Sequence, residues 1–366
     1  MPRYQNWSLS FQRQLSQNMA IDLAYVGNHG TRLIDGRSSA GVYDNMNPAS
    51  VLGLVPNATD LTNGAFTNGV PNALALADGF TKAPYPTFTG TVAQSLRMWP
   101  QYQQINWRFF PFGNSHYNAL QASLDRRMSA GFEFKVAYTY SRLMNNGSET
   151  GLGSGGPPVQ NPSDMRSLYS VSSDDVPNIF SVGWIYKLPF GKGRPLLSNT
   201  SGILNKIVGD WQISGIQSYS SGRPLSVTMP NSLGPYLFNY NRFPNKGGSG
   251  KGSGNGVTGP YLSQSGWTDP GSTSNGAPAF GNAPREDASV RGFHYFNEDI
   301  SISKDIFFTE STSLRFHADA GNAFNRVFFC PVDQFWIPNN GNGDFGKTGS
   351  QCNIPRRVQF ALELTF

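Results

Sequence analysis

The two cysteines are the side chains of this sequence with the clearest covalent chemistry. Cys330 and Cys352 lie in or beside one loop-like stretch near the C-terminus. In an oxidising compartment two thiols pair when their Cα atoms lie within about 7 Å of each other. Spacing along the chain does not show whether these two approach, so a disulfide and two separate thiols both stay open.

Metal-binding side chains are few. The histidines do not have the spacing of a zinc site, and they are His29, His116, His294 and His317. One stretch carries carboxylates that offer oxygen ligands to calcium, namely Glu149, Asp164, Asp174 and Asp175. A solvated loop explains these carboxylates more simply. We therefore predict no cofactor and leave a calcium site open.

Two glycine-rich stretches imitate phosphate-binding loops. GLGSGG at 151–156 lacks the strand-to-helix context of a dinucleotide fingerprint, and GGSGKGSG at 247–254 has Gly252 where a phosphate loop needs Ser or Thr. The sequence also lacks a signature for an activated Ser or Cys nucleophile. We predict that the protein is not an enzyme.

Aromatic residues within the loop-like stretches are a further candidate site. Rings of this kind stack on sugars, peptides and aromatic ligands. The candidate ligand contacts are Trp99, Tyr102, Trp107, Tyr236 and Tyr240. For any one of them, packing of one loop on another is the simpler interpretation.

Composition excludes several classes of protein. There are 28 Lys+Arg and 23 Asp+Glu, and only 14% of the residues are charged, whereas a soluble domain carries about 25%. The basic residues are not clustered, so we expect no nucleic-acid partner. No apolar run is long enough for a helical membrane span. With 41 Gly and 25 Pro, the chain favours short strands joined by loops.

Alternation of apolar and polar residues at period two is the strongest pattern, and it places successive side chains on opposite faces of a strand. It recurs in nine segments, near residues 7–15, 19–25, 116–127, 132–140, 180–188, 211–219, 296–306, 314–324 and 358–366. The last segment carries Val358, Phe360, Leu362, Leu364 and Phe366 on one face. Glu298 interrupts the apolar face of the seventh segment, which predicts a bulge there or a position near an interface.

The connections between these segments alternate in length. Short turns fall near 16–18, 128–131 and 307–312, with a medium one near 189–209. The long connections cover 29–115, 142–175, 221–290 and 325–355. All long connections fall on one side of an up-and-down sheet, which is typical of outer-membrane barrels. We predict an all-β, antiparallel transmembrane barrel, here a partial barrel of about nine strands, with its apolar face toward outer-membrane lipid.

The sequence resembles a known family in most of its strand segments. The phrases that carry the likeness are QNWSLSFQRQL, AIDLAYVGNHGTRL, HYNALQASLDRRMSAGFEFKVAYTYSR, LPFGKGRPL, DWQISGIQSYSSGRPLSV, HYFNEDISISKDIFFTESTSLRFHADAGNAFNRVFF and FGKTGSQCNIPRRVQFALELTF. They are similar to the barrel of TonB-dependent receptors with a carboxypeptidase-regulatory-like N-terminal domain, the Oar-like acidobacterial type. An aromatic residue is usual in that family where Glu298 stands here.

The resemblance implies a 22-stranded barrel with an N-terminal plug, energised through TonB and inserted by the barrel-assembly machinery. Residues 1–366 would then be the C-terminal part of that barrel, with its last nine strands and neither plug nor signal peptide. Long loops would be extracellular in a Gram-negative bacterium, and the C-terminus periplasmic. The predicted function is uptake of an unidentified small molecule, oligosaccharide or peptide.

Two other functions remain open from the sequence. A passive outer-membrane barrel would use its long loops as an adhesive or surface-binding area. A secreted β-sandwich that binds carbohydrate would turn the same alternation toward an apolar interior between two sheets.

Overall fold

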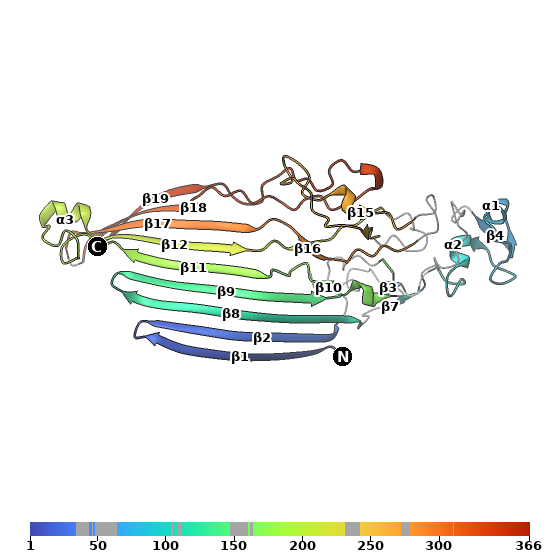
Figure 1. Ribbon diagram of the computed structural model, residues 1–366, viewed down its shortest axis with the longest axis horizontal. Coiled ribbons are helices and arrows are strands. Elements are labelled where there is room, and N and C mark those ends of the chain that lie inside the picture. The colour runs from blue at the N-terminus through green and yellow to red at the C-terminus, as the bar shows by residue number, and fades with distance from the viewer. Residues whose placement is uncertain are drawn as a thin grey trace.

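The computed structural model describes residues 1–33, 44–45, 47, 64–103, 105–107, 111–146, 160–161, 164–230, 242–271, 279–309 and 311–366. Its main feature is one long antiparallel sheet whose neighbouring strands follow in the order β1-β2-β8-β9-β11-β12-β17-β18-β19 (Figure 1). These strands are β1 (Arg3–Ser16), β2 (Met19–Leu33), β8 (Gly113–Ser129), β9 (Phe132–Asn145), β11 (Asn178–Lys187), β12 (Trp211–Ser220), β17 (Tyr295–Phe307), β18 (Ser313–Gly321) and β19 (Arg357–Thr365). A short strand, β10 (Ser170–Val171), extends the pairing of β9.

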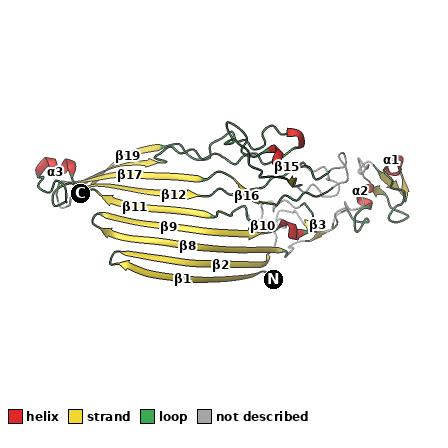
Figure 2. Ribbon diagram, viewed as in Figure 1, coloured by secondary structure: helices red, strands yellow, loops and turns green. Residues whose placement is uncertain are grey.

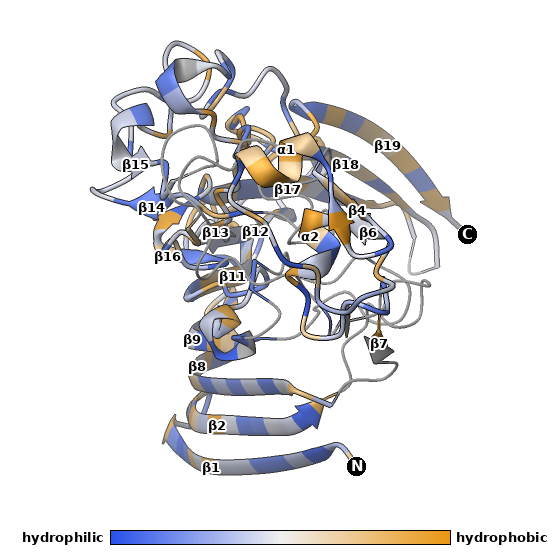
Figure 3. Cartoon of the chain, turned by 90° about the vertical axis from the view of Figure 1, so that its right-hand side faces the viewer, coloured by the Kyte–Doolittle hydropathy of each residue, from blue (hydrophilic) through white to orange (hydrophobic). Residues whose placement is uncertain are grey.

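The register carries the alternation of the sequence across the sheet, and alternating hydropathy is visible along β19 in Figure 3. Leu9 lies opposite Tyr25, Tyr25 opposite Leu120, and Leu120 opposite Tyr140, so one face is apolar from strand to strand. The apolar side chains of this face are largely exposed, and they include Leu9, Phe11, Tyr25, Leu120, Tyr140, Ile302, Phe360 and Leu362. An exposed apolar face of this extent matches a lipid-facing surface.

The opposite face is polar. Asp125 lies beside Lys135 with 3.3 Å between the charged groups, and Ser301 Oγ donates a hydrogen bond of 2.5 Å to Asp319. The β-sandwich alternative is therefore wrong, because it requires the apolar faces of two sheets to bury each other. Here the apolar face of a single sheet is the exposed one.

The sheet does not close. Among the described residues, β1 pairs only with β2 and β19 only with β18, so the two strands form free edges (Figure 1). This agrees with the predicted partial barrel, and the predicted fold class is confirmed. None of the described helices is long and apolar enough to span a membrane.

Short and long connections lie at opposite ends of the sheet (Figure 2). The turns of the β1-β2, β8-β9 and β17-β18 hairpins share one end with the β11-β12 connection, which contains α3 (Gly202–Val208). The long connections carry the small elements: β3 (Asp44–Asn45), β4 (Ala65–Thr67), β5 (Val70–Pro71), α1 (Ala73–Ala77), β6 (Gly90–Thr91), α2 (Val92–Ser95), β7 (Asn106–Trp107), β13 (Pro224–Leu225), β14 (Asn245–Lys246), β15 (Trp267–Thr268), β16 (Asp287–Arg291) and 3₁₀ turns at Met165–Leu168, Gln264–Gly266 and Pro338–Asn340.

Glu298 lies in a regular part of β17. Pairing with β12 runs without a shift from Tyr295 to Lys304, so the predicted bulge in this strand is wrong. The side chain is 1% exposed, and its carboxylate accepts hydrogen bonds from Arg326 Nε at 3.3 Å and Nη2 at 3.2 Å. A backbone irregularity lies instead at Asn322, which follows β18 and has a left-handed φ of 48°. A bidentate arginine offsets the cost of burying this charge.

Polar side chains of the apolar face pair across neighbouring strands. Tyr25 donates to Asn118 at 2.6 Å, and Tyr138 donates to Asn178 at 2.7 Å. Trp184 Nε1 donates to Gln217 at 2.9 Å, and Gln217 is the partner of Glu298 in the register. Glu298 therefore has a polar neighbour, Gln217, on the apolar face.

The two faces predict opposite responses to one charge. Arginine at Ile302, on the apolar face in the middle of β17, should lower the free energy of unfolding by about 2–4 kcal/mol, because lipid cannot solvate a cation. Arginine at its neighbour Ser303, on the polar face, should change it by less than about 0.5 kcal/mol. Urea unfolding in phospholipid vesicles measures both. Equal losses for the two variants would contradict the assignment of the faces.

Candidate functional site

The long connections at the loop end pack into a structured cap. Two of them, 221–290 and 325–355, share one buried apolar cluster. Its members are Leu225, Val227, Met229, Phe243, Leu262, Trp267, Ala283, Val290, Val332, Trp336 and Phe345. Because this cluster joins two loops separated by the β17-β18 hairpin, the cap has a core of its own.

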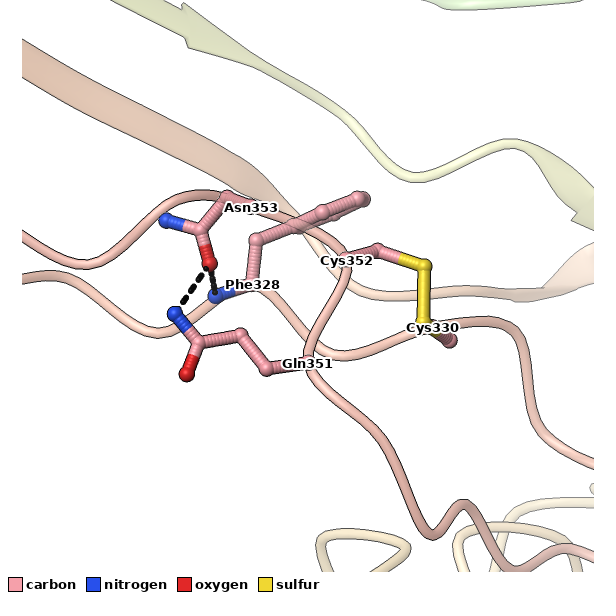
Figure 4. Close-up of a disulfide and its surroundings, with 5 residues drawn as sticks. All are labelled: Phe328, Cys330, Gln351, Cys352 and Asn353. Carbon is pink, nitrogen blue, oxygen red and sulfur yellow. Dashed lines mark hydrogen bonds between the residues drawn. A yellow bond between two sulfur atoms is a disulfide. The ribbon is translucent and has the colours of Figure 1, made fainter.

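A disulfide closes the last of these loops (Figure 4). The Cα atoms of Cys330 and Cys352 lie 4.8 Å apart. Cys330 N donates to Ser350 O and Cys352 N donates to Phe328 O. Asn353 Oδ1 accepts from both Phe328 N and Gln351 Nε2, at 2.8 Å and 2.9 Å. The bridge and these hydrogen bonds hold the two ends of the loop together.

Buried charges bind a third loop, 142–175, to the cap. Asp175, nearly inaccessible to solvent, accepts from Arg291 Nη2 at 2.6 Å and from Leu143 N at 2.6 Å. Arg285 is equally buried and donates to the carbonyl oxygens of Leu168 and Asn145. The contacts of the two arginines connect residues more than a hundred positions apart, so the three loops form one unit.

Two of the four carboxylates considered for calcium are occupied by arginines. Asp174 binds Arg223 at 2.8 Å and Asp175 binds Arg291, whereas Glu149 lies outside the described residues. Across the described parts of the chain, no group of three or more His, Cys, Asp or Glu side chains could hold a metal ion. Two of the histidines do meet, because His29 and His116 face each other across β2 and β8 with ring centroids 5.5 Å apart.

Burial also changes the electrostatics inside the cap. Loss of hydration lowers the pKa of Arg242, while the Asp269 carboxylate 3.1 Å away acts in the opposite direction. Burial raises the pKa of Tyr261, whose hydroxyl donates to Arg291 O at 2.6 Å. The Arg242–Asp269 pair and the Tyr261–Arg291 hydrogen bond both lie within the cap.

A separate lobe extends from the connection between β2 and β8. Residues 64–103 pack Phe66, Ala75, Phe88, Val92 and Ala93 into a small core. Phe280 of the 221–290 loop packs against this core, which links the lobe to the cap. Figure 1 shows the lobe, with α1, α2 and β4, at the far end of the molecule from α3.

Two concave surfaces open on the inner side of the sheet. A cavity of about 380 Å³ lies where the strands meet the cap, and its lining includes Ser181, Ser218, Phe293, Tyr295 and Phe328. A larger hollow of about 1280 Å³ lies toward the turn end, lined by polar side chains such as Gln12, Glu133, Lys135, Asp299 and Asp319. The smaller one falls within the size of small-ligand pockets, which is about 300–1,000 Å³.

The sequence of residues 1–359 matches the family described as outer membrane beta barrel domain. The chain belongs to this family. An outer-membrane location follows from that membership, and the apolar face of the sheet is the lipid face of a barrel domain. No curated protein matches the sequence.

Solved outer-membrane proteins show fold similarity at low identity. The outer membrane transporter YddB from Escherichia coli aligns with a TM-score of 0.43 and 8% identity, covering 99% of this chain and 32% of that one. The pyoverdine receptor FpvA from Pseudomonas aeruginosa PAO1 aligns with a TM-score of 0.39 and 12% identity, covering 99% and 29%. The chain therefore spans about a third of the length of these proteins.

The structure describes the side chains of two of the five predicted aromatic contacts. Trp99 and Tyr102 lie in the 64–103 lobe, 40% and 55% exposed, and the Asn47 amide donates to both of their backbone oxygens. Trp107 lies in β7, but its side chain is outside what the structure describes, and so are Tyr236 and Tyr240. Of the five candidate contacts, the structure therefore places the side chains of Trp99 and Tyr102 alone, and it puts both in the lobe.

Sequence reasoning missed the aromatic residues of the smaller cavity. Tyr295 packs edge-on against Phe328 with ring centroids 5.5 Å apart, and Phe293 packs against Phe329. The signal that could have found them is the aromatic run FHYF at 293–296, directly before the apolar alternation of β17. The predicted C-terminal signature residues, from Val358 to Phe366, all lie exposed on the lipid face at the β19 edge.

The buried carboxylate Asp175 should be essential to the cap. The variant Asp175→Asn leaves Arg291 without its charge partner, and we expect the cap to lose about 3 kcal/mol or more of stability. Its neighbour gives a matched control: Asp174→Asn breaks a solvent-exposed pair and should cost less than about 1 kcal/mol. Rates of limited proteolysis within 221–290 measure the difference. Similar rates in both variants would show that Asp175 does not hold the cap.

The disulfide should stabilise the cap rather than the sheet. Replacing both cysteines with serine frees a loop of about twenty residues, which costs about 3 kcal/mol in the chain-entropy account. We expect faster proteolysis within 325–355, while the heat-dependent gel mobility of the barrel stays unchanged. A shift in that mobility would place the role of the bridge in the sheet itself.

Proposed function

We propose that this chain is the C-terminal barrel part of a TonB-dependent receptor of the Oar-like acidobacterial type, which takes up a nutrient across the outer membrane. The observation that carries the proposal is a preorganised cap above a barrel wall whose inner face is polar and hollow. Ligand capture needs the cap, and a passage needs a polar lumen. The strand phrases shared with that receptor type support the subtype.

The complete receptor in this proposal contains more than residues 1–366. The free edges of β1 and β19 expose backbone donors and acceptors that lipid cannot satisfy. Further strands would pair with both edges, a plug would fill the polar hollow, and TonB would move the plug. The cap would face outward and the C-terminal strand the periplasm, where its exposed apolar side chains would be read by the barrel-assembly machinery.

The chemistry of the smaller cavity indicates the class of nutrient. Its lining combines the rings of Phe293, Tyr295 and Phe328 with the hydroxyls of Ser181 and Ser218. This combination suits a largely neutral molecule with apolar faces and hydroxyl or amide groups. An oligosaccharide or a short peptide has these properties.

Passive surface binding is a second candidate, and one observation favours it. The 64–103 lobe exposes Val70, Leu74, Leu76 and Met98 although it has a core of its own. An exposed apolar tip far from the sheet would contact another surface without any transport.

Uptake by living cells distinguishes the two functions. Accumulation of labelled oligosaccharides and peptides is compared in wild-type cells, in cells lacking the gene for this chain, in cells lacking TonB and in cells treated with a protonophore. Energised uptake predicts that one nutrient class accumulates in the wild type only. If ligand is retained at the surface equally in all but the gene deletion, the protein is a passive binder.

Two tyrosine variants sharpen this experiment. Tyr295→Ala removes a ring from the cavity and should raise the KM for uptake by about tenfold, equivalent to about 1.4 kcal/mol of binding energy. Tyr102→Ala removes an exposed ring from the lobe and should leave uptake unchanged. If Tyr102→Ala raised the KM and Tyr295→Ala did not, the ligand would bind at the lobe and not in the cavity.

A further inference from the structure

The connection between β11 and β12, residues 188–210, has an unusual distribution of apolar side chains. It contains α3, which lies beyond the strand ends on the turn side of the sheet (Figure 1). In α3, Ile203 is 78% exposed, Leu204 56% and Ile207 59%. Helical spacing brings these three side chains onto one side of the helix.

The polar side of α3 is turned toward its own connection. Asn205 Oδ1 accepts hydrogen bonds from Lys192 N at 2.6 Å and from Thr200 Oγ1 at 3.3 Å. A helix on the surface of a water-soluble protein buries its apolar side and exposes its polar side. Here the arrangement is inverted, so the apolar side needs an apolar medium or a partner.

Contacts with the sheet show which side of the barrel wall α3 occupies. Trp211 and Lys304 are paired in the register, in phase with Ile213 and Ile302 of the lipid face. Trp211 Nε1 donates to Ile207 O at 2.9 Å, and Lys304 Nζ donates to Gly209 O. Two side chains of the lipid face thus hold the C-terminal end of α3, so the helix continues that face.

A further contact ties α3 to the next turn of the barrel. The ammonium group of Lys206 lies 5.4 Å from the centre of the Phe308 ring, which is itself exposed in the β17-β18 turn. The apolar surface therefore extends from the strands over the rim of the barrel.

The charges of the connection complement an acidic surface. Residues 189–210 carry Lys192, Arg194 and Lys206 against the single carboxylate of Asp210. Arg194 Nη2 lies 3.9 Å from an Asp210 carboxylate oxygen, whereas the Lys192 side chain is exposed. Exposed cations beside an exposed apolar stripe are the two features of a helix that lies in a membrane interface.

We propose that residues 188–210 form a lipid anchor at the rim of the barrel. The apolar side of α3 inserts among the acyl chains of the leaflet on the turn side, and Lys192 and Lys206 bind phospholipid phosphates. The occupant is phospholipid because this surface is continuous with the lipid face of an outer-membrane barrel domain. The proposal rests on family membership and on the proposed orientation, with the turn side toward the periplasm, and not on nutrient uptake or TonB.

Photochemical crosslinking in isolated outer membranes tests the anchor. A diazirine amino acid replaces Ile203 in the full chain, and adducts are identified by mass spectrometry after illumination. A matched control carries the same group at Val257, which is exposed in the cap. We expect phospholipid adducts at position 203 to exceed those at position 257 by about tenfold.

Other adducts would overturn the proposal. A protein adduct at position 203 would assign α3 to a protein partner, and a lipopolysaccharide adduct would assign it to the other leaflet. Equal lipid yields at 203 and 257 would mean that the helix lies in water. Adducts are scored only in membranes in which the variant keeps its heat-dependent gel mobility, so that a misfolded variant is excluded. The diazirine is also placed at Leu204 as a second position on the apolar side of α3.

The cations are tested separately from the apolar side. Lys192→Gln combined with Lys206→Gln should lower the yield of phosphatidylglycerol adducts at position 203 more than that of phosphatidylethanolamine adducts. An unchanged ratio would remove phosphate binding from the proposal. Wild-type cells that show no energised uptake but still give the lipid adducts would contradict the proposed function and leave the lipid anchor supported.

Discussion

A main chain in lipid must satisfy its own hydrogen bonds, and every other feature of this structure depends on that requirement. Between its two free edges, the sheet meets it through antiparallel strands with long registers, as in the ten consecutive pairs between β12 and β17. Regular pairing preserves the two-residue alternation of each strand, so a lipid face and a polar face form together. A slip of one residue would exchange the two faces of a strand.

Several polar side chains on the lipid face find hydrogen-bond partners. At the loop end, tyrosines and a tryptophan donate to amide side chains, and Glu298 takes up Arg326. At the turn end, Lys304 reaches the backbone of the β11-β12 connection. These hydrogen bonds reduce the cost of placing polar groups on a face that is otherwise apolar.

The strands could be predicted from the sequence because alternation is a local property, and the positions of the long connections followed from it. Glu298 was recognised as an exception, but its partner Arg326 follows the next strand and cannot be found by periodicity. The cap was beyond prediction for the same reason. Asp175 meets Arg291, and Trp267 meets Trp336 in one cluster, only through packing between distant loops. Residue type alone selected Tyr102, whereas the smaller cavity is lined by Phe293, Tyr295 and Phe328, which packing between strands and loops brings together.

The core of the cap joins residues from Leu225 to Phe345, with the whole β17-β18 hairpin between them in the chain. Contacts of such long sequence separation form late, because the intervening chain must be ordered first. The cap therefore matures only after the neighbouring hairpins have zipped together. Correct cap packing therefore indicates that strand assembly is complete. In a stalled barrel, the tryptophans of the cap core would be unpacked and its loops open to the proteases of the cell envelope.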